Sequence, residues 1–107
     1  MAAKARREES GKSDGNEALR ESRRELGRQL KAWRESKGLT QADLAADLGL
    51  KYYSFISQVE NGIGRIPQDL YLPWADALSV DRSTFCWKVL EHIEPSLYAQ
   101  LADAGQG

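Results

Sequence analysis

The chain has 107 residues, of which 41% are hydrophobic and 29% are charged, and its formal net charge is −1. This length leaves room for one domain and a tail, and no apolar run approaches the roughly 18–20 residues of a membrane-spanning helix. The only cysteine, Cys86, cannot form an intrachain disulfide, and the charged N-terminus lacks the apolar stretch of a secretory signal, so we expect a cytoplasmic protein.

The charges are unevenly distributed along the chain. Residues 1–37 hold 11 Lys and Arg against 7 Asp and Glu, whereas residues 38–107 hold 4 against 9. Nucleic-acid-binding domains usually carry a basic surface, so the acidic second part counts against that function. The acidic second part does not exclude DNA binding, because each phosphate group interacts mainly with the charges close to it.

The first 18 residues are rich in Ala, Lys, Glu, Ser, Gly and Asp and show no periodic apolar pattern. This composition predicts a disordered tail. The tail is either only solvated or a basic arm that touches DNA through Lys4, Arg6, Arg7 and Lys12. The acidic residues between these cations weaken the second interpretation.

A helix is predicted over residues 19–37, where Leu26, Leu30 and Trp33 form an apolar stripe. Gly27 inside it costs about 1 kcal/mol relative to Ala, which indicates a close approach of another helix. Gly38 is expected to end the helix.

Two short helices follow. Thr40 and Asp43 predict a capping box at the start of the first, and Gly49 ends it after about two turns. The second is predicted over residues 52–60, with Ile56 and Val59 facing the core. Helices of this length depend on tertiary packing for their stability.

Two further helices complete the predicted fold. Pro67 suits the first position of the fourth helix, but Pro73 inside it removes a backbone hydrogen bond, so that helix is either kinked or begins later. Asp81 caps a fifth helix that extends to about residue 93, and Pro95 ends it. The prediction is an all-α protein of about five short helices, with a disordered tail at 1–18, a helical domain at 19–94 and a C-terminal tail at 95–107.

The sequence gives little support for catalysis. His92 and Cys86 are the only histidine and the only thiol, and their spacing on one helix points them in different directions. No catalytic set, metal-ligand cluster or glycine-rich phosphate loop can be assembled. We therefore expect no enzyme activity, no metal and no cofactor.

DNA binding fits the pair of short helices better, because an α-helix fits the major groove and its side chains can read base edges. Gln58 can pair with adenine, and a serine can contact either type of base. The alternative is that these polar side chains form an ordinary solvated surface. Phe55 is either a core residue, which we favour, or a contact to a thymine methyl group.

Residues 26–80 resemble the helix-turn-helix domain of the Cro/repressor (Xre-type) regulators. The matching segments are LGRQLKAWRESKGLTQADLAADLG, ISQVENG, RIP and WADALSV. The resemblance implies a lambda-repressor-like fold and a second short helix that enters the DNA groove. It also implies a partly buried ion pair between Arg34 and Glu60 that joins the first and third helices.

Together, the residue chemistry and the resemblance give the candidate site. The residues expected to contact bases are Tyr52, Tyr53, Ser54, Ser57 and Gln58. The residues expected to contact phosphates are Gln41, Lys51, Asn61 and Arg65.

The segment LKYYSF departs from the family pattern by one additional residue. Either the turn is longer than usual, or the recognition helix begins one residue earlier. These two alternatives place different residues of positions 51–54 toward the bases.

These observations predict a sequence-specific transcriptional regulator, in particular a repressor that binds a two-fold-related operator in double-stranded DNA as a homodimer. The candidate dimer interface comprises Leu90, Ile93, Leu97, Tyr98 and Leu101, which alternatively only cover the core of the monomer. The alternative function is a protein-interaction module, such as an antitoxin or adaptor, whose acidic surface binds a protein partner.

Overall fold

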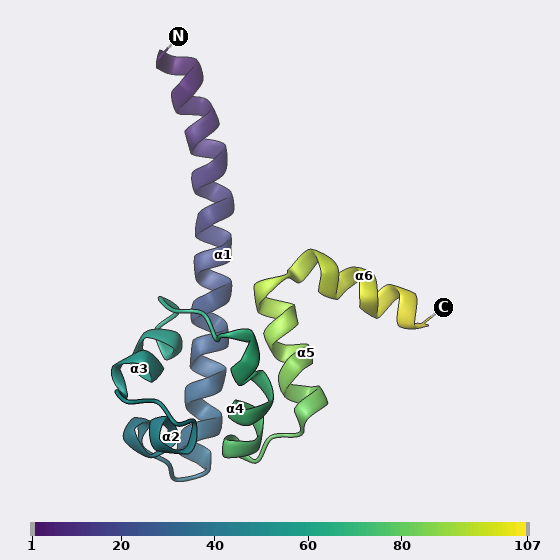
Figure 1. Cartoon of the computed structure of the whole chain (residues 1–107). Helices are drawn as coiled ribbons and strands as arrows, with labels where there is room; N and C mark the ends of the chain where they lie inside the picture. The colour runs from purple at the N-terminus through teal and green to yellow at the C-terminus, as the bar shows by residue number, and fades with distance from the viewer. Residues whose placement is uncertain (1, 107) are drawn as a thin grey trace.

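The computed structural model describes the backbone of residues 2–106 and the side chains of residues 17–105. It contains six α-helices and one short 3₁₀ helix: α1 (Ala2–Ser36), α2 (Gln41–Asp47), α3 (Ser54–Glu60), η1 (Gln68–Leu70), α4 (Tyr71–Leu78), α5 (Arg82–Ile93) and α6 (Pro95–Gln106). Residues 2–106 include no strand, and the all-α prediction is confirmed. Helices α2 to α5 gather around the C-terminal half of α1, whose N-terminal half extends away from them (Figure 1).

Helix α1 begins much earlier than the sequence pattern predicts. The helix was expected from about residue 19 after a disordered tail, but the structure shows helix from Ala2. An apolar stripe is not needed for backbone hydrogen bonds, and the exposed surface of residues 17–28 carries Glu–Arg pairs three residues apart. The side chains of the proposed basic arm lie outside the described ones.

A single apolar core joins α1 to α5. Trp74 and Phe85 are its largest fully buried side chains, and Trp33 of α1 stacks on Phe85 with 5.9 Å between ring centroids. The other large buried side chains are Leu26, Leu30, Leu44, Ile56, Val59, Ile66, Leu78 and Val89. Because every one of these helices contributes to this core, the short α2 and α3 are held by tertiary packing rather than by their own propensity.

Local signals set the position of α2. Gly38 adopts a φ of +80° and ends α1, as predicted. The Thr40 hydroxyl then accepts a hydrogen bond from the Asp43 N–H at 3.0 Å, and the Asp43 carboxylate accepts one from the Thr40 N–H at 2.9 Å. This capping box fixes the first turn of α2 relative to the end of α1, also as predicted.

The fourth helix begins later than Pro67. Residues Gln68–Leu70 form η1, and α4 begins at Tyr71, which places Pro73 at the third helical position. The first four N–H groups of a helix have no partner within it, so proline is tolerated there without a kink. Of the two alternatives that the sequence left open, the later start is the correct one.

The C-terminal segment, which was expected only as a tail, forms the helix α6. Helix α5 has its predicted bounds, and the Asp81 side chain caps it by accepting a hydrogen bond from the Thr84 N–H at 3.0 Å. Pro95 ends α5 and occupies the first position of α6. Helix α6 packs against α5 through Tyr98 and Trp87, whose ring centroids are 5.9 Å apart.

Candidate nucleic-acid interface

The turn between α2 and α3 is six residues long, from Leu48 to Tyr53. Gly49, its second residue, has a φ of +71°, and the Leu50 N–H donates to the Ala45 carbonyl at 2.8 Å in a glycine-based helix ending. Helix α3 begins at Ser54, so its predicted start at residue 52 was wrong. The additional residue of LKYYSF therefore lengthens the turn and does not extend α3.

Helix α3 has one buried and one outward face. Ile56, Val59 and Glu60 are buried, whereas Ser54, Gln58 and Asn61 are exposed and Ser57 is half-buried between them. The outward positions repeat at three- and four-residue spacing, so they lie on a single helix face. This face can present hydroxyl and amide groups to a ligand along two turns.

Two tyrosines extend the outward face beyond the start of α3. Tyr52 and Tyr53 lie in the turn and are 66% and 58% exposed. The Lys51 ammonium lies 5.7 Å from the ring centroid of Tyr52, within range of a cation–π contact. Large aromatic rings this exposed gain little from folding, which indicates a contact surface.

Phe55 belongs to the core side of α3. It is half-buried, and its ring meets Trp74 edge-on with 6.5 Å between centroids. The structure therefore favours a core role for Phe55 over a contact to a thymine methyl group.

A buried ion pair holds α3 against α1. The Arg34 guanidinium donates two hydrogen bonds to the Glu60 carboxylate, from Nε to Oε2 at 2.7 Å and from Nη2 to Oε1 at 3.0 Å. A third donation, from Nη1 to the Leu39 carbonyl at 2.7 Å, ties the same guanidinium to the entrance of α2. The hydrogen bonds that Arg34 donates to the Glu60 carboxylate raise the pKa of the Arg34 guanidinium above its usual value.

Gln41 joins this network from the first turn of α2. Its side-chain Nε2 donates to Glu60 Oε1 at 3.0 Å, and the side chain is half-buried. One N–H of the Gln41 amide group is therefore engaged inside the protein, and the other remains available to a ligand. The arrangement fixes α2 and α3 relative to each other through one carboxylate.

The closest approach of α1 and α3 occurs at Gly27. A Cβ on Gly27 would lie 2.1 Å from the Glu60 carbonyl oxygen and 2.9 Å from that of Val59. Only glycine fits there, which confirms the close helix approach predicted from its presence in an otherwise ordinary helix.

Asn61 and Arg65 belong to the loop that follows α3, and both are exposed. The Asn61 Nδ2 donates to Ser57 Oγ at 3.5 Å, a long hydrogen bond that a ligand can replace. Gly62, with a φ of +79°, turns the chain away from the helix between these two residues.

Two arginines that were not selected from the sequence lie at the same loop. A Cβ on Gly62 would lie 2.8 Å from Arg24 Cγ, so Arg24 of α1 packs directly against it. Arg23 lines a small crevice together with Gly64 and Arg65. The basic excess of residues 1–37 was the available signal, but only the packing of α1 on α3 shows which cations reach the loop.

The titratable groups elsewhere do not form a reaction centre in the described part of the chain. His92 Nδ1 lies 3.0 Å from the Lys88 carbonyl, and Cys86 is half-buried on the same helix. Side chains 17–105 contain no group of three or more His, Cys, Asp or Glu that could hold a metal ion.

Comparison with known proteins places this geometry in a family. Residues 25–85 match the model of a helix-turn-helix domain family, and the chain belongs to that family. The match is consistent with the Xre-type regulators that the sequence resembles, a class of DNA-binding proteins that are typically not enzymes. No curated protein matches the chain significantly. Among the described residues, no helix combines the length and apolar character needed to cross a membrane.

Proposed function

We propose that this protein is a sequence-specific transcriptional regulator, in particular a repressor, that inserts α3 into the major groove of double-stranded DNA. The observation that carries the proposal is the outward face of α3, where Ser54, Ser57 and Gln58 project from a helix whose opposite face is locked into the core. A helix held in this way presents its side chains at fixed positions, which base readout requires. Tyr52 and Tyr53 extend the same surface toward the neighbouring bases.

Four residues around this face are proposed to contact phosphates. Lys51 precedes α3, and Asn61 and Arg65 follow it, so they flank the inserted helix at its two ends. Gln41 is proposed to use its backbone N–H and the second N–H of its side-chain amide. These contacts set the position of the protein on DNA, and the α3 side chains select the sequence.

A homodimer on a two-fold-related operator is also proposed, because a single short helix buries too little surface for tight specific binding. The proposed interface lies on α5 and α6, where Leu97 and Leu101 are 45% and 40% exposed and Leu90, Ile93 and Tyr98 are half-buried. Trp87, 44% exposed, borders the same surface. Two copies that meet there would present two α3 helices to successive turns of the major groove.

The test is binding to a DNA fragment that carries the promoter of the protein's own gene, compared with random-sequence DNA, at several salt concentrations. The proposal predicts tighter binding to the promoter, with log affinity falling by about 0.9 for each phosphate contact per log unit of salt. Equal affinity for both DNAs would overturn sequence-specific regulation, and an affinity independent of salt would overturn DNA binding itself.

The second candidate is a protein-interaction module on the same fold, such as an antitoxin or adaptor. The exposed carboxylates of α2, at Asp43 and Asp47, and the acidic excess of residues 38–107 favour it. The exposed cations beside α3, Lys51 and Arg65, disfavour it. Absence of any retarded DNA complex in the same experiment would favour this alternative.

A further inference from the structure

The loop that follows α3 packs against α1. The Gly62 contact is made with the Arg24 backbone as well as its side chain, because a Cβ on Gly62 would also lie 2.9 Å from Arg24 N. The backbone and the first side-chain carbons of Arg24 are therefore held against the loop. The Arg24 side chain is 45% exposed. Arg24 precedes residues 25–85, the part of the chain that matches the family model.

Arg23, the residue before Arg24 on α1, meets the same loop. It lines the crevice that also contains Gly64 and Arg65, and it is half-buried. Within residues 17–105, neither Arg23 nor Arg65 has a carboxylate within salt-bridge distance. Three arginines thus meet at one short loop, and among side chains 17–105 Arg24 alone of the three has a carboxylate partner.

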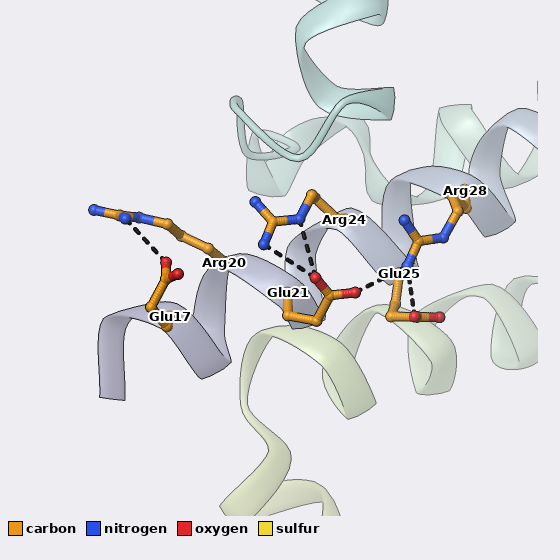
Figure 2. Close-up of polar contacts among 6 residues, drawn as sticks. All are labelled: Glu17, Arg20, Glu21, Arg24, Glu25 and Arg28. Atoms are coloured by element: carbon orange, nitrogen blue, oxygen red, sulfur yellow. Dashed lines mark hydrogen bonds and ion pairs between the residues drawn. The ribbon is translucent and has the colours of Figure 1, made fainter. Parts of the chain in front are cut away.

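That partner is Glu21, and it is shared. Arg24 donates to Glu21 Oε1 from Nε at 3.1 Å and from Nη2 at 3.0 Å, and Arg28 donates to Glu21 Oε2 at 3.0 Å. Figure 2 shows the Glu21 carboxylate between the two guanidinium groups, all three on the surface of α1. The hydrogen bond from Arg24 is the main reason that the pKa of Glu21 lies below its usual value. Exposed pairs of this kind are weak, so a phosphate can replace the carboxylate.

We propose that Arg23, Arg24 and Arg65 form a binding site for the DNA backbone, with α1 as a second contact element beside α3, and that Glu21 competes with the phosphate for Arg24. This proposal rests on the proposed DNA-binding function. Arg65 lies in the loop that follows α3 and is proposed to contact phosphate. Arg24 packs against Gly62 of this loop, and Arg23 lines a crevice with Gly64 and Arg65, so α1 brings two more cations to the same loop. One stretch of DNA backbone bound at Arg65 would therefore lie close to α1.

The test compares Arg24→Gln and Arg23→Gln with Arg82→Gln, using a random-sequence DNA duplex and a salt titration. Arg82 is a matched control, because it is an exposed arginine paired with one carboxylate, Asp76, at 2.7 Å, and it lies at the start of α5 away from the loop. Loss of Arg24 or Arg23 should reduce the salt slope by about 0.9 for each protomer bound, whereas loss of Arg82 should leave the slope unchanged. Circular dichroism of each variant verifies that the helices are retained.

A second comparison tests the role of Glu21. Glu21→Gln should tighten binding to the same duplex, whereas Glu91→Gln, which removes a half-buried carboxylate paired with Lys88 on α5, should tighten it less. If both Glu variants tighten binding equally, Glu21 acts only through net charge, and the proposal that it competes with phosphate for Arg24 is wrong. If the wild type binds DNA with a normal salt slope but Arg24→Gln and Arg82→Gln behave alike, the α1 site is wrong and the proposed function stands. If the wild type binds neither the random-sequence duplex nor the promoter fragment, the α1 site and the proposed function are both overturned.

Discussion

The Cα of Gly27 lies so close to the carbonyl of Glu60 that an added Cβ would come within 2.1 Å of the oxygen. This contact sets the distance between α1 and α3, and therefore how far the outward face of α3 projects from the body of the domain. The obstacle is backbone rather than a flexible side chain, so it cannot yield without a shift of one helix.

Gly27→Ala should destabilise the protein, although alanine is the better helix former. The steric cost of overpacking, about 1–3 kcal/mol, exceeds the gain of about 1 kcal/mol in helix propensity. Gly105→Ala is the matched control, since a Cβ there meets nothing within 4 Å in α6 and should slightly raise stability. Urea denaturation measures both, and equal stability of the two variants would contradict the contact.

Glu60→Gln should be strongly destabilising, because it leaves the Arg34 guanidinium buried opposite a neutral group. Breaking one partner of a buried ion pair costs about 3–5 kcal/mol. Asp76→Asn, which breaks the exposed pair with Arg82, should produce a much smaller loss in the same denaturation experiment. Replacing Arg34 and Glu60 together by apolar residues should recover much of the stability, and failure of this recovery would show that the charges themselves are required.

Acid should weaken the start of α5. The hydrogen bond from the Thr84 N–H lowers the pKa of Asp81 below its ordinary value of 3.8. The folded state therefore binds this proton less readily than the unfolded state does, so the contribution is present above pH 3.8 and is lost as the pH falls through the lowered value. Asparagine caps a helix about as well as aspartate does, so Asp81→Asn should retain stability at neutral pH and lose less of it in acid. Parallel acid-induced losses in wild type and variant would contradict this assignment.

Gln58→Ala should relax sequence preference, because Gln58 is an exposed amide on the outward face of α3 and is proposed to read a base. The expected loss is about 1–3 kcal/mol on the promoter site and little on random DNA. Arg65→Ala should weaken binding to both DNAs alike, since a phosphate contact carries no sequence information. Binding titrations on the two DNAs separate these outcomes, and equal losses for Gln58→Ala on both would remove it from the base-reading set.

Leu97→Glu and Leu101→Glu should shift the protein from dimer to monomer. Both side chains are partly exposed on α6, in the proposed dimer interface, and a buried unpaired carboxylate there would be costly. Leu72→Glu is the control, because Leu72 is equally exposed, at 42%, but lies on α4. Sedimentation at several concentrations reports the assembly state, and a wild-type monomer at all concentrations would overturn the proposed interface.

Features that depend on neighbouring residues could be predicted from the sequence. The capping box of Thr40 and Asp43, the end of α1 at Gly38 and the cap of α5 at Asp81 involve groups within a few residues of each other. Their geometry is set by backbone conformation and short-range hydrogen bonds, which residue type indicates directly. The helical content and the pair of short helices followed from these signals and from the apolar periodicity.

The start of α1 could not be predicted in this way. The apolar stripe begins at Leu26, but the helix extends back to Ala2, and its surface between Glu17 and Arg28 carries exposed Glu–Arg pairs. Apolar periodicity reports which part of a helix is packed against a core, not how far its backbone hydrogen bonds extend.

By itself, the sequence determined that this protein is an all-α helix-turn-helix protein, because caps, turns and apolar spacing are local properties of the chain. Only the tertiary structure decided that the additional residue lengthens the turn, that Phe55 packs toward Trp74, and that Arg24 lies against Gly62. The last two relationships join residues 19 and 38 positions apart in the chain, and the contact of Arg24 with Gly62 depends on how closely α1 and α3 approach. That distance results from the packing of the whole core, and no local pattern of residues encodes it.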